Sequence, residues 1–440
     1  MNIDRAKQEI KNTLHAYFSK DENGEYVINR LRQRPILLIG APGIGKTQIM
    51  EQIADEEQVA LVSYTLTHHT RQSAIGLPFI EKKTYSENEY SVTEYTMSEI
   101  IASVYEEMEK TGCENGILFL DEINCVSETL APTMLQFLQA KTFGTHRLPD
   151  GWLIVAAGNP PEYNKSVRDF DVATLDRIRK INVQPDFEAW KLYALKKLIH
   201  PAIIAYLTIK PQFFCKIETN VDGRFFATPR GWEDLSELIY SYENLGVETD
   251  RDIIAEYIQF PDISKDFANY LELYYKYENR YKAEKILSGI IDEQLCEELK
   301  KARFDEKLSV ISILISAIGK DAKKIWQMAN KLEGMKQEFE KLDEDKKDEF
   351  RNHFYKLSDE YEALYDELGK KTEYGFDFME AAFENGQEII FFMTLLNESP
   401  YILSFLKEYD CERYYEYNKK LLFEDEEDVI LKKGEKIFGR

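Results

Sequence analysis

The chain has 440 residues, of which 44% are hydrophobic, and its formal net charge at pH 7 is −23. This length suggests two or three domains, each with enough apolar residues for a packed core. Because so large a negative charge repels phosphate backbones, we expect no direct binding of nucleic acid. No run approaches the ~20 apolar residues of a membrane span, and residues 1–5 lack the apolar core of a signal peptide. We therefore expect a cytoplasmic protein.

The N-terminal segment predicts an amphipathic helix, because apolar residues recur there every three to four positions. These residues are Ala6, Ile10, Leu14 and Tyr17. Residues 34–39, which are apolar after Arg34, are typical of a buried parallel strand, and residues 48–57 predict a helix.

Between this strand and this helix the sequence matches the pattern GxxxxGK[ST]. The matching residues are Gly40, Ala41, Pro42, Gly43, Ile44, Gly45, Lys46 and Thr47. The glycines allow a tight loop whose backbone N–H groups point at phosphates, at the N-terminus of the helix. Lys46 supplies a cation for the β- and γ-phosphates, and Thr47 offers its hydroxyl to Mg²⁺. The strand–loop–helix context favours a P-loop for a nucleoside triphosphate over an ordinary glycine-rich turn.

The long segment 65–115 separates the P-loop region from the next buried strand. Within it, residues 74–80 and 89–95 alternate as two strands around a polar tip at 82–88. This pair of strands is either a functional insert of the nucleotide-binding domain or a plain surface hairpin.

A second apolar run, residues 116–120, ends in Asp121 and Glu122. This pattern predicts a buried parallel strand with two carboxylates at its carboxyl end, where open α/β sheets bind ligands. Asp121 would hold Mg²⁺, and Glu122 would act as general base toward the attacking water. A solvated acidic pair is the alternative for this run alone, but the P-loop upstream favours the catalytic interpretation.

A hairpin is predicted at 141–152, and a third apolar strand follows at 152–157. It ends in Gly158-Asn159-Pro160, so the Asn159 side chain could contact the γ-phosphate or the water. As an isolated signal, this tripeptide is also typical of a turn.

Further on, residues 174–180 carry a short basic cluster that contains Arg177. From Glu188 onward the pattern predicts helices only, and Arg230 stands near the start of one of them.

Two heptad seams lie in the C-terminal part of the chain. The first has Ile325, Met328, Leu332, Met335, Phe339 and Leu342, and the second has Phe350, Phe354, Leu357, Tyr361, Leu364 and Leu368. They predict two helices of about twenty residues that fold back as an antiparallel coiled-coil hairpin over about 323–368, with Gly369 as the C-cap. The hairpin either packs on its own domain or docks a partner or a neighbouring subunit.

Taken in order, these motifs resemble the AAA+ ATPases, and within them the MoxR-like group. GAPGIGKT (40–47) and ILFLDEIN (117–124) correspond to Walker A and Walker B. Asn159 in VAAGNP matches sensor 1, and Arg230 in ATPRGWEDLS matches the sensor 2 arginine. Arg177 in TLDRIRKI matches the arginine finger, for which the nearby Arg179 is the alternative. The hairpin of segment 65–115 looks like the helix-2 insert of this group, which is aimed at a central pore.

The resemblance implies an α/β P-loop AAA+ core with a parallel sheet, followed by an all-helical lid and a helical C-terminal domain. We expect the N-terminal helix and nucleotide-binding domain at 1–187, the lid at 188–285 and the C-terminal domain at 286–440.

By the same resemblance, the protein would be an ATPase that uses ATP and Mg²⁺. It would form a homo-oligomeric ring, a hexamer, and remodel or mature a protein client, such as a protein with a von Willebrand factor A domain. Two alternatives are a nucleotide-dependent switch or scaffold with little turnover, and a GTP-driven motor linked to nucleic acid.

Overall fold

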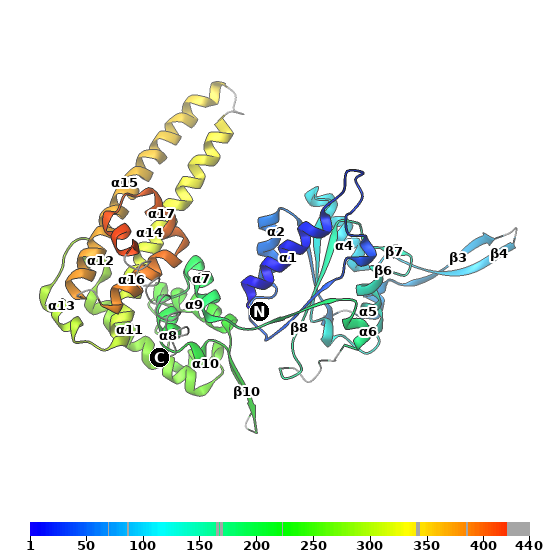
Figure 1. Cartoon of the computed structure of the whole chain (residues 1–440), viewed down its shortest axis with the longest axis horizontal. Helices are drawn as coiled ribbons and strands as arrows, with labels where there is room; N and C mark the ends of the chain where they lie inside the picture. The colour runs from blue at the N-terminus through cyan, green and yellow to red at the C-terminus, as the bar shows by residue number, and fades with distance from the viewer. Residues whose placement is uncertain are drawn as a thin grey trace, which may run out of the picture. The chain divides into compact units, whose positions relative to one another are not determined.

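The computed structural model describes residues 1–68, 70–85, 88–163, 167, 170–221, 223–339, 344–383 and 386–419. The chain divides into two compact units. One comprises residues 1–189 with 228–230, and the other comprises residues 190–227 with 231–440. Figure 1 labels their helices and strands.

The first unit alternates strands and helices. Its strands are β1 (Ile36–Gly40), β2 (Ala60–Thr65), β3 (Pro78–Tyr85), β4 (Asn88–Tyr95), β5 (Gly116–Asp121), β6 (Thr142–Phe143), β7 (His146–Arg147), β8 (Trp152–Gly158) and β9 (Arg179–Val183). Its α-helices are α1 (Ile3–Phe18), α2 (Gln48–Glu57), α3 (Arg71–Ile75), α4 (Glu99–Thr111), α5 (Ala131–Ala140) and α6 (Val172–Leu175), and the short 3₁₀ helix η3 (Ile123–Cys125) follows β5.

Five of these strands form one sheet in the order β2-β5-β8-β1-β9, and every neighbouring pair is parallel. The predicted α/β fold with a parallel sheet is therefore confirmed. Since β5, β8 and β1 are adjacent, the residues at their carboxyl ends meet along one edge of the sheet. These residues include Asp121, Gly158 and Gly40.

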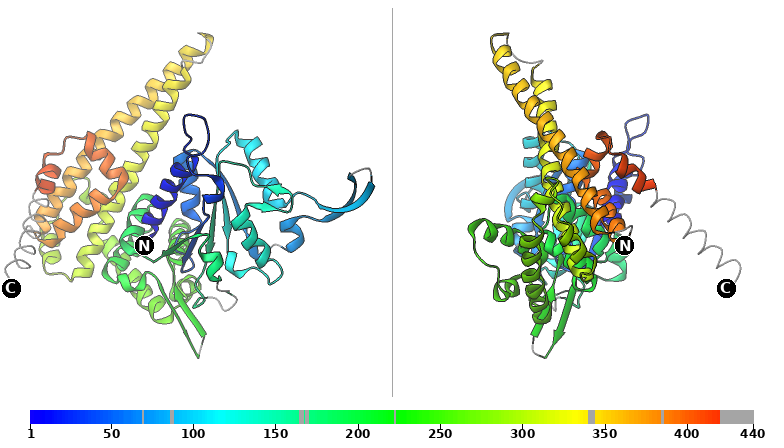
Figure 2. Two further views of the ribbon diagram at one scale, coloured as in Figure 1. Left: turned by 45° about the vertical axis from the view of Figure 1, so that its right-hand side comes forward. Right: turned by 90° about the vertical axis from the view of Figure 1, so that its left-hand side faces the viewer.

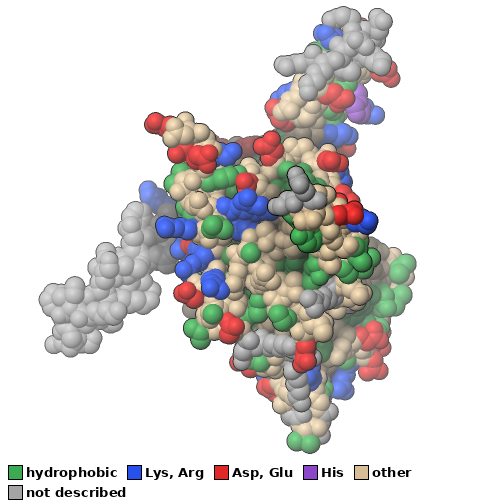
Figure 3. Space-filling model, turned by 90° about the vertical axis from the view of Figure 1, so that its right-hand side faces the viewer, with side chains coloured by type: hydrophobic (Ala, Val, Ile, Leu, Met, Phe, Trp, Pro, Cys, Tyr) green, Lys and Arg blue, Asp and Glu red, His purple; other side chains and the backbone are tan. Residues whose placement is uncertain are grey.

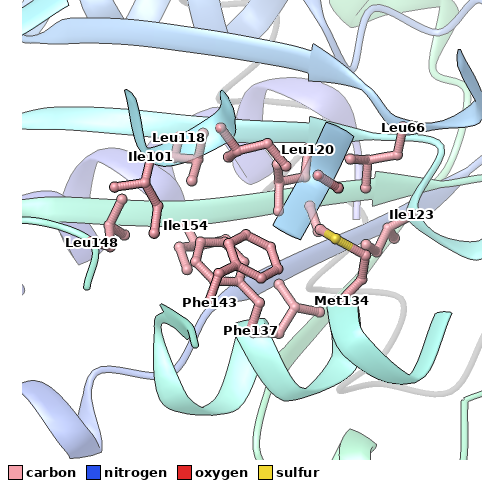
Figure 4. Packing of buried hydrophobic residues seen from close by; sticks show 14 of the residues in the cluster. Leu66, Ile101, Leu118, Leu120, Ile123, Met134, Phe137, Phe143, Leu148 and Ile154 are labelled. Atoms are coloured by element: carbon pink, nitrogen blue, oxygen red, sulfur yellow. The ribbon is translucent and has the colours of Figure 1, made fainter. Parts of the chain in front are cut away.

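A buried apolar cluster packs one face of this sheet against α4 and α5. Figure 4 shows Leu118, Leu120 and Ile154 of the sheet close to Phe137 of α5. The ring of Phe137 stacks on that of Phe143, with 4.0 Å between the ring centroids. The N-terminal helix α1 packs against α2 and β9, and its four predicted apolar residues are all buried, as the periodicity predicted.

The insert between β2 and β5 differs in detail from the prediction. The first strand begins at Pro78 rather than at residue 74, because residues 71–75 form α3 and the chain turns at Gly76, which has φ = 104°. The two strands also extend into the expected polar tip, where Lys82 pairs with Glu89 across the ribbon. Residues 86 and 87 of that tip lie outside the described residues. The second predicted hairpin is present as β6 and β7.

The second unit is mainly helical. Its elements are α7 (Phe187–Lys197), α8 (Pro201–Ile209), β10 (Lys216–Asn220), β11 (Gly223–Ala227), α9 (Pro229–Leu245), α10 (Arg251–Tyr257), α11 (Pro261–Tyr281), α12 (Ala283–Ile286), α13 (Glu293–Lys300), α14 (Phe304–Phe339), α15 (Glu344–Ala382), α16 (Gln387–Glu398) and α17 (Pro400–Glu408), with α7 and α9 starting in the first unit. Helix α14 packs against α8 and α11 as well as α15, α16 and α17. The predicted boundary near residue 285 between lid and C-terminal domain stays a prediction.

The prediction of an all-helical lid is wrong at one place. Strands β10 and β11 form an antiparallel ribbon with Lys216 opposite Ala227 and Asn220 opposite Gly223. The β-branched and aromatic residues of both segments favour this conformation. Ile217 and Phe226 are an example, and they lie directly opposite each other.

Helices α14 and α15 lie side by side in both views of Figure 2 and project as a long hairpin. In the first seam Ile325, Leu332 and Met335 are buried, and near the hairpin end Phe339 faces Phe350 with 6.0 Å between the ring centroids. Leu342 of the predicted seam lies outside the described residues.

These helices are much longer than the predicted twenty residues, with 36 residues in α14 and 39 in α15. The prediction of Gly369 as a C-cap is wrong, because α15 continues to Ala382. At Gly369, a Cβ would lie 2.3 Å from Cε2 of Tyr409. The glycine therefore provides space for the Tyr409 ring.

On the face drawn in Figure 3, several Lys and Arg side chains gather on one part of the surface, and hydrophobic side chains are scattered over the rest. Within the part of the chain that the structure describes, no single helix is both long and apolar enough to cross a membrane. The pair α16–α17, bent by 91°, meets the length and composition criteria when its two helices are combined.

Candidate functional site

The predicted P-loop connects the end of β1 to the start of α2. Gly43 and Gly45 have φ values of 74° and 92°, which residues with a Cβ adopt only at a cost. A Cβ on Gly43 would also lie 3.2 Å from the Thr228 hydroxyl. Ala41 and Ile44 are buried, so the loop is anchored by apolar contacts while its glycines shape the backbone.

The Lys46 side chain folds back over this loop. Its Nζ donates to the carbonyl oxygens of Gly40 and Ala41, both at 2.8 Å, and to Oδ1 of Asn159 at 3.0 Å. Lys46 is only 8% exposed. A buried ammonium group is stable only with such acceptors. These three hydrogen bonds therefore fix the Lys46 Nζ between the P-loop and Asn159, which follows β8. The structure thus brings the predicted Walker A and sensor 1 residues into direct contact.

Thr47 and Asp121 also come together across the sheet edge. The Thr47 hydroxyl donates to Oδ2 of Asp121 at 2.9 Å. A hydroxyl and a carboxylate are the oxygen ligands that Mg²⁺ prefers, and in P-loop sites the ion keeps waters and phosphate oxygens as its other ligands. The pair therefore fits the predicted magnesium site. The described residues contain no cluster of three or more His, Cys, Asp or Glu side chains arranged to hold a metal ion by themselves.

Glu122 follows Asp121 at the point where β5 ends. Its backbone N–H donates to Oδ1 of Asp121 at 2.9 Å, and its φ of 57° places it in the left-handed region. A non-glycine residue in this region costs free energy and is uncommon. This backbone turn separates the two acids, because Asp121 stays on the strand while Glu122 caps η3.

Asn159 is held from two sides. Its side-chain oxygen accepts from Lys46, and its main-chain oxygen accepts from Nδ2 of Asn124 at 2.7 Å. The sequence motifs assign no role to Asn124. Its signal in the sequence is only a polar residue two positions after Glu122, in DEIN.

The two candidate finger residues have different environments. Arg177 is exposed, and its Nη1 donates to Oε1 of Gln139 on α5 at 2.7 Å. Arg179 lies in β9, and its guanidinium donates to the Thr13 hydroxyl at 2.5 Å and to Glu9 at 3.5 Å, both on α1. Both arginines are therefore hydrogen-bonded within their own unit, and Arg177 is the more exposed of the two.

Arg230 reaches the P-loop through its backbone. Its N–H donates to the Gly43 carbonyl oxygen at 3.2 Å, and its side chain is exposed. Residues 228–230 belong to the first compact unit, although α9 continues into the second. Among the residues that the structure describes, no hydrogen bond or ion pair joins the Arg177 or Arg230 side chain to another predicted site residue.

A cavity of about 660 Å³ adjoins the P-loop at the carboxyl edge of the sheet. Its lining includes Gly40 and Ala41 of the loop, Asn159 and Asn124 from the neighbouring strand ends, and Lys180 of β9. This volume lies within the range of small-molecule sites.

Residues 35–178 match the family model described as "AAA domain (dynein-related subfamily)". The matched range falls within the α/β unit, and the helical unit lies outside it. Among solved structures, the chain is similar to one described as a "putative ATPase" from Cytophaga hutchinsonii, with 19% identity and a TM-score of 0.28. The similarity covers 44% of this chain and 56% of that protein. No curated protein matches the chain.

Proposed function

We propose that this protein is a MoxR-like AAA+ ATPase that hydrolyses ATP in a Mg²⁺-dependent reaction. One observation carries this proposal: hydrogen bonds join Lys46 to Asn159 and Thr47 to Asp121 at the carboxyl ends of three adjacent parallel strands. Such an edge is where open α/β sheets bind their ligands.

Each residue has a distinct task in the proposed reaction. Lys46 contributes positive charge beside the loop, and Thr47 with Asp121 would hold Mg²⁺. The bound metal–nucleotide complex supplies the phosphoanhydride bond and the cation that offsets its negative charge. Glu122 takes a proton from the attacking water, and Asn159 orients that water or the terminal phosphate.

The test compares Glu122→Gln with Lys46→Ala. Because a general base typically contributes about 10²–10⁴-fold, Glu122→Gln should lower kcat by that factor and keep nucleotide binding. Lys46→Ala should instead lose binding. Glu114→Gln is a matched control, since Glu114 is exposed and precedes the opposite end of the same strand β5.

Steady-state ATPase rates and nucleotide titrations distinguish the outcomes. Unchanged turnover in Glu122→Gln would remove Glu122 from the reaction. A wild-type protein that binds ATP without turnover would be a nucleotide-dependent switch rather than a motor.

The ring and its client are part of the same proposal, and the resemblance of the motifs to the MoxR-like group supports them. The ring would be a hexamer with Arg177 of one protomer acting on the nucleotide of the next, which the exposure of Arg177 permits. The client would be a protein with a von Willebrand factor A domain. Capture of clients by the Glu122→Gln protein, followed by mass spectrometry, tests this identity.

A further inference from the structure

Asn124 makes a buried contact between the loop after β5 and the end of β8. It lies in η3, two residues after Glu122, and is 5% exposed. Its Nδ2 donates to the main-chain oxygen of Asn159 at 2.7 Å. Since a carbonyl oxygen only accepts, the side-chain nitrogen rather than the oxygen must face it.

The backbone of β8 is shaped to receive this amide. A Cβ on Gly158 would lie 2.4 Å from Oδ1 of Asn124, 2.7 Å from its Cγ and 2.9 Å from its Nδ2. All three distances are too short for a real contact, so only glycine fits opposite Asn124. The close approach thus depends on both residues.

Asn159 is therefore positioned by two hydrogen bonds with different origins. Asn124 holds its main-chain oxygen, and Lys46 holds its side-chain oxygen at 3.0 Å. Asn124 and Glu122 share one short turn, so the contact couples the turn of the proposed base to the proposed sensor. Loss of the Asn124 amide would release Asn159 on one side only.

We propose that Asn124 is a positioning residue that sets Asn159 relative to Lys46 and Glu122 for the hydrolysis step. This inference rests on the proposed ATPase function. Asn124 acts through Asn159 and contributes to turnover rather than to nucleotide binding, because its amide bonds the protein backbone and not the P-loop. Small misplacements of catalytic groups can lower a rate by about 10²-fold, which is large enough to measure.

The experiment is a double-mutant cycle with Asn124→Ala and Asn159→Ala, in which kcat, KM, nucleotide affinity and thermal midpoint are measured. We expect Asn124→Ala to lower kcat by about 10–100-fold and to change nucleotide affinity by less than about 3-fold. Because both residues act as one unit, the double variant should be no slower than Asn159→Ala alone. Asn12→Ala, at an exposed position of α1, controls for loss of an asparagine.

Two further variants keep the inference testable if Asn124→Ala folds poorly. Asn124→Asp has the same shape but cannot donate to the Asn159 oxygen, and Gly158→Ala displaces the amide while keeping both asparagines. Each should reproduce the kcat defect with nucleotide binding retained.

The positioning role would be overturned if the kcat losses of Asn124→Ala and Asn159→Ala multiply in the double variant. A normal kcat in Asn124→Asp would overturn it as well. The parallel comparison of wild type with Glu122→Gln keeps the two proposals apart. If wild type turns over and Glu122→Gln does not, the ATPase function stands whatever Asn124 does. If wild type shows no turnover, the ATPase proposal fails and the positioning role fails with it.

Discussion

The Thr47 hydroxyl and the Asp121 carboxylate form a 2.9 Å hydrogen bond that joins the P-loop to the end of β5. The two residues are 74 positions apart in the chain. The parallel order of the sheet places β1 and β5 on either side of β8, so their carboxyl ends lie within reach of each other.

This contact predicts a defect in Mg²⁺ dependence when the hydroxyl is removed. Thr47→Ala should raise the Mg²⁺ concentration for half-maximal turnover by at least about 10-fold, the lower end of the effect of losing even an outer hydrogen-bond partner of a metal ligand. Thr47→Ser keeps the hydroxyl and should stay close to wild type. Metal titrations of ATPase activity measure the effect, and an unchanged titration of Thr47→Ala would contradict the assignment.

The proposed ring, with Arg177 as its arginine finger, predicts complementation between two inactive proteins. A finger acts on the neighbouring subunit, so Arg177→Ala mixed with Glu122→Gln should form some interfaces with both residues intact and recover part of the activity. Native mass spectrometry would confirm that subunits mix.

Arg179→Ala is the control for this mixing experiment. Because Arg179 contacts α1 of its own chain, its loss should lower thermal stability more than turnover. Mixed rings without recovery would mean that Arg177 acts in cis or has a structural role.

Because the Lys141 ammonium is buried, we expect the free energy of unfolding to depend on pH. It is 5% exposed, its Nζ lies 3.4 Å from Oε1 of Gln33, and burial lowers the pKa of its ammonium from 10.5 to about 8. At about 1.4 kcal/mol per pKa unit, this lowering corresponds to a cost of up to about 3.5 kcal/mol at pH 7. Lys141→Met keeps the apolar stem without the charge and should raise the free energy of unfolding toward that limit.

The sign of the pH effect follows from the lowered pKa. Between pH 8 and 10.5 the unfolded state binds more protons at Lys141 than the folded state, so folding becomes more favourable as pH rises. The advantage of Lys141→Met should therefore shrink between pH 7 and pH 9.5 in urea titrations. If the difference in unfolding free energy between Lys141→Met and wild type stays constant from pH 7 to pH 9.5, burial of the Lys141 charge is not the cause of that difference.

Two glycines of the long hairpin predict opposite effects of the same substitution. At Gly334 in α14 a Cβ would meet no atom within 4 Å, so Gly334→Ala should stabilise by up to about 1 kcal/mol through helix propensity. At Gly369 in α15 the methyl group would collide with the Tyr409 ring, which stacks on Phe405. Gly369→Ala should thus destabilise by about 1–3 kcal/mol despite the better propensity. Thermal melts of the two variants compare the effects directly. If both substitutions shift the melting temperature equally and in the same direction, the predicted clash with Tyr409 does not occur.

The local motifs could be predicted because their geometry depends on neighbours in the sequence. The segment 36–57 forms strand, loop and helix almost at the predicted bounds, since the apolar run, the glycines and the helical residues each act within a few positions. The first heptad seam likewise indicated the buried positions Ile325, Leu332 and Met335 of α14, because helical periodicity determines which residues share a face.

What only the tertiary structure decided depends on contacts between distant segments. The ring of Tyr409 explains why Gly369 lies inside a helix. Helix α1 supplies the hydrogen-bond partners of Arg179, whereas Gln139 of α5 supplies that of Arg177. The contact of Asn124 with Asn159 arises because β5 and β8 are neighbours in the sheet, an adjacency that no local pattern encodes. Sequence periodicity reports which side of an element is buried, whereas partners across the fold depend on how the elements pack.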